Sequence, residues 1–145
     1  SAGMLVTEAA AYYRKQGKTL WDVLQAIYEK YGYTCEEGVN IVLDGITGRA
    51  RIERMMQWIR ANQPTTIAGY SVDHIVDYIG GVEDLPAQNA MRFFIDADTW
   101  FAIRPSGTEP KIKFYFYAND ESMDKAKEKN AAIRDAILDL INSVE

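Results

Sequence analysis

The chain has 145 residues, of which 48% are hydrophobic and 26% charged, enough for one hydrophobic core and barely enough for two. Sixteen basic against twenty-one acidic residues give a formal net charge of −5, which disfavours general attraction to nucleic acid or anionic lipid. Charges interrupt every apolar run before the roughly 20 residues of a membrane helix, and the single cysteine, Cys35, cannot form an internal disulfide. We therefore expect a soluble cytoplasmic protein with no membrane partner.

The N-terminal part of the sequence predicts two short helices. Residues 4–16 are alanine-rich and stop at Gly17, a residue suited to the left-handed position after a helix. A second helix is expected after Thr19, a plausible N-cap, and ends at Gly32. Two short amphipathic helices cannot bury their apolar stripes alone. Residues 4–33 are therefore predicted to be a helical remnant of a preceding domain, able to self-associate through those stripes.

The remainder of the sequence predicts an α+β domain. Residues 49–61 have apolar side chains at helical spacing, and residues 121–143 repeat that pattern at the end of the chain. Between them, β-branched and aromatic residues predict strands at residues 67–78, 90–97, 99–103 and 111–118. This order predicts a four-stranded antiparallel sheet with two helices packed on one face. The predicted domain spans residues 49–145, residues 34–48 are expected to be a linker with at most a short strand, and residues 1–3 a cloning remnant.

The loop RPSGTEP, at residues 104–110, is the strongest candidate for a binding site. Arg104 and Lys113 flank it and can both contact an anion, the arginine through its planar fork of donors. Ser106 and Thr108 add hydroxyl groups, and Gly107 lets an anion approach the backbone amides. The pattern is that of a phosphate cradle, although Pro, Ser and Gly are also ordinary turn residues.

The segment RPSGTEPKIKFYFYA resembles the phosphate-binding signature of the α-D-phosphohexomutases, the family of phosphoglucomutases and phosphomannomutases. The resemblance extends to GITGRARIERMMQW and to the N-terminal helices. It implies a fourth domain with a TATA-binding-protein-like fold. It also implies that Arg104, Ser106, Gly107 and Thr108 contact the phosphate that is not transferred, with Lys113 as a second cation.

The resemblance further implies the chemistry of a longer parent enzyme. Such enzymes exchange phosphate between a phosphoserine and a hexose phosphate through a hexose 1,6-bisphosphate, with Mg²⁺ bound by a loop of aspartates. This chain contains neither the TASHNP-like serine motif nor a DGDxDR loop. It is therefore predicted to be a C-terminal phosphate-binding domain, most similar to that of a phosphoglucomutase. We expect no catalytic residue or metal ligand in it, no activity alone, and the N-terminal domains of the parent as its partner.

A non-catalytic binding module is the alternative interpretation. Strand alternation places Lys111, Lys113, Tyr115 and Tyr117 on one sheet face. A basic, aromatic face of this kind can bind RNA bases or a protein partner. The acidic composition and the incomplete RNA-binding motif argue against nucleic acid.

Three further features of the sequence are expected to be structural. The only histidine, His74, has no others with which to form a metal site, so a surface strand position is expected. Residues 96–98, with aspartates at both ends, predict a hairpin turn, and residues 36–38 (EEG) a solvated part of the linker.

Overall fold

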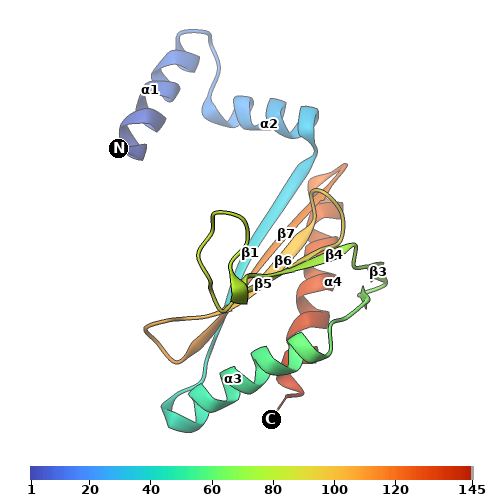
Figure 1. Ribbon diagram of the computed structural model, residues 1–145. Coiled ribbons are helices and arrows are strands. Elements are labelled where there is room, and N and C mark those ends of the chain that lie inside the picture. Colours follow the sequence, from blue (N-terminus) through green and yellow to red (C-terminus); the bar gives the residue numbers. More distant parts are fainter. Residues whose placement is uncertain (145) are drawn as a thin grey trace.

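The computed structural model describes residues 1–144 (Figure 1). The helices and strands predicted from the sequence occur in the predicted order, and an additional strand at residues 33–42 precedes the third helix. The elements are α1 (Ala2–Arg14), α2 (Leu20–Tyr31), β1 (Tyr33–Val42), α3 (Gly45–Ala61), β2 (Thr66–Ile67), β3 (Tyr70–Ser71), β4 (His74–Asp77), the 3-10 turn η1 (Tyr78–Gly80), β5 (Met91–Phe94), β6 (Trp100–Pro105), β7 (Lys111–Asp120) and α4 (Met123–Asn142).

The main sheet is antiparallel and has the strand order β1-β7-β6-β5-β4. Its strands β4 to β7 correspond to the four predicted ones, so the α+β fold class is confirmed. The first predicted strand is shorter than expected, because residues 66–71 instead form the separate two-stranded hairpin β2-β3. The sheet has five strands rather than four, because β1 is added at its edge.

Strand β1 occupies residues 34–42 of the segment that was expected to be a linker with at most a short strand, so that prediction was wrong for these residues. All ten of its residues pair with β7, from Tyr33 opposite Asp120 to Val42 opposite Lys111. Its inward side chains Val39 and Ile41 pack against the hydrophobic core. The polar sequence EEG gives no strand signal, because an edge strand needs apolar residues on one face only. Its pairing partner also lies about 80 residues later in the chain, so no local pattern indicates the pairing.

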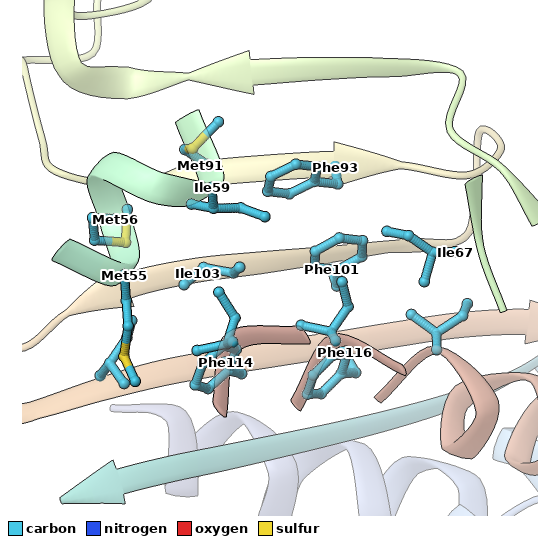
Figure 2. Close-up of a cluster of buried hydrophobic side chains, with 14 of the residues drawn as sticks. Met55, Met56, Ile59, Ile67, Met91, Phe93, Phe101, Ile103, Phe114 and Phe116 are labelled. Carbon is cyan, nitrogen blue, oxygen red and sulfur yellow. The ribbon is translucent and has the colours of Figure 1, made fainter. Parts of the chain in front are cut away.

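The core lies between one face of the sheet and the helices α3 and α4 (Figure 2). Alternate residues of β7, such as Phe114 and Phe116, are buried, and Phe93 and Phe101 stack with ring centroids 4.5 Å apart. The helices contribute stripes at three- and four-residue spacing, as expected. These stripes are Ile52, Met55, Met56 and Ile59 of α3 and Ile133, Ile137 and Ile141 of α4. The other sheet face, here called the open face, carries no helix of the described chain.

The N-terminal helices extend beyond the end of β1, away from the core (Figure 1). Their ends form as the sequence predicts: Gly17 has φ +73°, and the Thr19 hydroxyl accepts a hydrogen bond from the Asp22 amide. Neither helix contains a buried residue. Large apolar side chains are exposed on both, including Leu5 at 68% and Trp21 at 65%. None of the helices in residues 1–144 is long and apolar enough to cross a bilayer.

Candidate functional site

The RPSGTEP loop connects two central strands of the sheet. Strand β6 ends at Pro105 and β7 begins at Lys111, and the register places Arg104 directly opposite Lys113. The neighbours of both residues, Ile103 and Phe114, are buried on the helix side. Because successive side chains of a strand alternate between faces, Arg104 and Lys113 lie together on the open face at the base of the loop.

These two cations are available to a ligand. Arg104 is exposed and Lys113 is half-buried. Within residues 1–144 neither side chain forms an ion pair or a hydrogen bond. Two like charges on opposing strands without a counter-ion repel one another. An anion bound between them would relieve this repulsion, so anion binding at the pair is favourable.

The third cation of the loop, Lys111, has a partner. Its ammonium group is 2.6 Å from the Glu109 carboxylate. The hydrogen bond from Lys111 lowers the pKa of the Glu109 carboxyl below its ordinary value, and the positive charges of Lys111 and Lys113 add to this effect. Glu109 and Lys111 therefore neutralise one another, and Arg104 and Lys113 carry the positive charge that has no ion-pair partner within residues 1–144.

The backbone of the loop is only partly free to bind an anion. The Ser106 amide donates to the Lys111 carbonyl at 2.8 Å, so it cannot join the predicted cradle without a rearrangement. The amides of Gly107 and Thr108 have no acceptor within residues 1–144, and an added Cβ at Gly107 would meet nothing within 4 Å. The loop thus offers two adjacent free amide donors at its exposed tip.

Ser106 and Gly107 also line a cavity of about 180 Å³ between the loop and α3. Its other polar lining residues are Arg49 and Glu53 of α3, Asn89 before β5, and the paired Glu109 and Lys111. No sequence signal marks Arg49 or Asn89 as part of the site, because Arg49 is one of several arginines on a helix surface and Asn89 lies in an irregular segment. Arg104 and Lys113 do not line this cavity. The predicted site residues therefore lie on two sides of the loop, with the cations on the open face and Ser106 and Gly107 facing the cavity.

The structure also shows the turn at residues 96–98 and the position of His74. The Asp98 amide donates to the Asp96 carboxylate at 2.9 Å, which is the expected turn between β5 and β6. His74 is an exposed strand residue whose Nδ1 lies 2.7 Å from the Asp73 carboxylate. In the described part of the chain, no three His, Cys, Asp or Glu side chains are placed to hold a metal ion.

Comparison with known proteins identifies the class to which this loop and fold belong. The family model described as "Phosphoglucomutase/phosphomannomutase, C-terminal domain" matches residues 48–138, which include most of α3, the sheet strands β4 to β7 and the RPSGTEP loop. The chain belongs to this family of C-terminal domains. The resemblance found in the sequence is thereby confirmed.

Two bacterial phosphoglucomutases are similar to this chain in sequence. The chain is 34% identical over 141 residues to the phosphoglucomutase of Staphylococcus aureus (strain MSSA476), which covers 89% of the chain and 25% of that relative. It is 36% identical over 122 residues to that of Staphylococcus saprophyticus, covering 77% of the chain and 22% of the relative. The chain thus spans about a quarter of the length of these relatives.

A solved structure shares the fold. It is the open form of the exocytosis-sensitive phosphoprotein pp63/parafusin, a phosphoglucomutase from Paramecium, with a TM-score of 0.59 and 17% identity. The alignment covers 94% of this chain and 24% of that one. At this level of identity the likeness concerns the fold alone.

Proposed function

We propose that this chain binds the phosphate of a hexose phosphate that is not being transferred, within a phosphoglucomutase. The proposed ligands are Arg104, Lys113, the Ser106 and Thr108 hydroxyls and the Gly107 amide. The observation that carries the proposal is the pair of cations without a counter-ion at the base of the RPSGTEP loop, in an otherwise acidic chain. Membership of the phosphoglucomutase/phosphomannomutase C-terminal domain family supports it.

Such a site would contribute to catalysis through orientation. Free energy from contacts with a remote phosphate can hold the reacting hydroxyl in line with a phosphoryl donor. The chemistry itself would be done elsewhere in the longer protein, by a phosphoserine and a bound Mg²⁺ acting on a hexose 1,6-bisphosphate. The described residues contain no cluster of metal ligands, so no residue of this chain is assigned to that metal. We propose a cytoplasmic location.

We also propose a division of the chain into two parts. The helices α1 and α2 belong to a preceding domain, and the sheet with α3 and α4 forms the phosphate-binding domain. The exposed apolar side chains of α1 and α2 support this division, because helices with such stripes need a partner surface. That partner is another domain of the same protein or, in its absence, a second copy of this chain.

Titration of the ¹⁵N-labelled chain with glucose 6-phosphate, followed by NMR, tests the proposal. Amides of residues 104–108 and of Lys113 are expected to shift first. Arg104→Ala removes a charge-assisted contact of about 1.5 to 3 kcal/mol, so affinity should fall roughly ten- to a hundred-fold. Arg14→Ala, which removes an exposed arginine from α1, is the matched control and should change nothing.

Two results would count against the proposal. One is unchanged affinity in Arg104→Ala, with the fold intact by circular dichroism. The other is the absence of shifts at the loop with glucose 6-phosphate, while short RNA shifts the amides of Tyr115 and Tyr117. That second pattern would favour the non-catalytic binding module instead.

A further inference from the structure

The open face carries a continuous stack of flat side chains across four strands. Trp100 and Tyr117 stack with ring centroids 5.3 Å apart, and at the far side His74 and Phe94 stack at 4.2 Å. The guanidinium of Arg92 lies between the two pairs, 3.9 Å from the Trp100 ring and 4.5 Å from the Phe94 ring. The stack therefore ends at Tyr117, next to the edge strand β1.

Beyond Tyr117 the open face is hollowed. A depression of about 400 Å³ is lined by Tyr117, Trp100 and Tyr115 on one side and by Glu36 and Gly38 of β1 on the other; we call it the hollow. Gly38 lies opposite Tyr115 in the register, and a Cβ added there would meet only one carbonyl oxygen, at 4.0 Å. The hollow thus exists because position 38 has no side chain, and its volume is within the roughly 300 to 1,000 Å³ of ligand pockets.

The hollow shares its face with the two free cations. Lys113, Tyr115 and Tyr117 are alternate residues of β7, so they follow one another on this face at steps of about 7 Å. The hollow begins at Tyr115, one step from Lys113. A small molecule whose phosphate is held by Arg104 and Lys113 therefore lies one such step along β7 from the hollow.

The chemistry of the lining suits a sugar ring. Aromatic rings pack against the apolar C–H faces of a pyranose, while a carboxylate accepts hydrogen bonds from its hydroxyl groups. Glu36 is exposed and has no hydrogen bond or ion pair within residues 1–144. The neighbouring Glu37 is engaged on the other face, where its carboxylate is 2.8 Å from the Arg134 guanidinium. One free acceptor therefore remains beside the aromatic wall.

We propose that the hollow binds the hexose ring of the phosphate-anchored ligand, with Tyr115 and Tyr117 packing against the ring and Glu36 accepting hydrogen bonds from its hydroxyls. This inference rests on the proposed function, because the loop cations are what bring the sugar to this face. It assigns to this chain a share in sugar recognition as well as in phosphate binding.

The test compares two probes, inorganic phosphate and glucose 6-phosphate, in NMR titrations of the chain. The wild type should bind glucose 6-phosphate at least about fivefold more tightly, with shifts at Gly38 and Tyr117. Gly38→Leu fills the hollow at a position where the backbone can accommodate a side chain. It should abolish the preference while leaving the affinity for inorganic phosphate unchanged.

Two more variants complete the design. Glu36→Gln alters an exposed side chain and should reduce the preference two- to threefold without affecting the fold, which keeps the test valid if Gly38→Leu does not fold. Gly80→Leu, the same substitution at a glycine with open space around it, should behave as the wild type.

The outcomes separate the two proposals. If both probes bind the wild type equally, or if the preference survives in Gly38→Leu and Glu36→Gln, the sugar subsite is refuted and the phosphate site stands. If neither probe shifts the loop amides, both proposals are refuted.

Discussion

Asn130 of α4 offers a sharp test of how the edge strand β1 is held. Its side chain is 1% exposed, and its Nδ2 donates to the Cys35 carbonyl of β1 at 2.7 Å. Its Oδ1 is buried and has no hydrogen-bond partner within residues 1–144. Because β1 has a neighbouring strand on only one side, contacts from α4 such as this one add to its pairing with β7 in holding the strand in place.

The expected cost follows from these contacts. Asn130→Ala loses a buried hydrogen bond but also removes the unpartnered Oδ1, so we expect the free energy of unfolding to fall by about 1 to 2 kcal/mol. For a chain of this size, this lowers Tm by roughly 2 to 8 °C. Asn130→Asp keeps the shape but places a buried carboxylate against a carbonyl oxygen, and it should cost about 3 kcal/mol or more at pH 7.

The pH dependence of Asn130→Asp gives a second signature. Burial and the facing carbonyl raise the pKa of the introduced carboxyl in the folded state above its unfolded value. The cost is therefore complete above the raised pKa and shrinks as the pH falls through it, because the protonated acid can donate to the carbonyl. The gap between Asn130→Asp and the wild type should narrow between pH 7 and pH 5.

Urea unfolding followed by circular dichroism measures these differences, and hydrogen exchange of the β1 amides locates them. Lys127→Ala, at an exposed position of the same helix, is the control for helix propensity and should stay within about 0.5 kcal/mol of the wild type. Wild-type stability of both Asn130 variants at pH 7, or unchanged exchange in β1, would refute the role assigned to this side chain.

Three further predictions concern the sheet, the loop and helix α3. Arg92→Ala removes two cation–π contacts from the open face and should lower stability by about 1 to 3 kcal/mol in urea unfolding, with little effect on phosphate binding; an unchanged midpoint would refute it. Lys111→Met removes the hydrogen bond that lowers the pKa of Glu109, so that pKa should rise towards its ordinary value in a ¹³C NMR titration of the carboxyl. Gly48→Ala should destabilise the fold by more than about 2 kcal/mol, because the added Cβ would overlap the preceding backbone, whereas Gly107→Ala has open space and should leave Tm unchanged.

The positions of most candidate site residues could be predicted from the sequence, because they follow from strand alternation and from the composition of one turn. The two-residue period of β6 and β7 is enough to place Lys113, Tyr115 and Tyr117 on one face and Phe114 on the other. The composition of residues 104–110 is enough to place a turn there. The hydrogen bond from the Ser106 amide to the Lys111 carbonyl could not be predicted from periodicity, because it depends on the conformation of this particular loop.

The sequence by itself determined the elements whose signals are local: the amphipathic helices, the glycine and Thr19 helix ends, and the presence of four strands rich in β-branched and aromatic residues. Only the tertiary structure decided where β1 lies, which side chains complete the stack around Arg92, and that Gly38 leaves a hollow beside Tyr117. The physical reason is that a strand's partner, and therefore the neighbours of its side chains, is chosen by contacts between segments far apart in the chain. Propensity and periodicity describe one segment at a time.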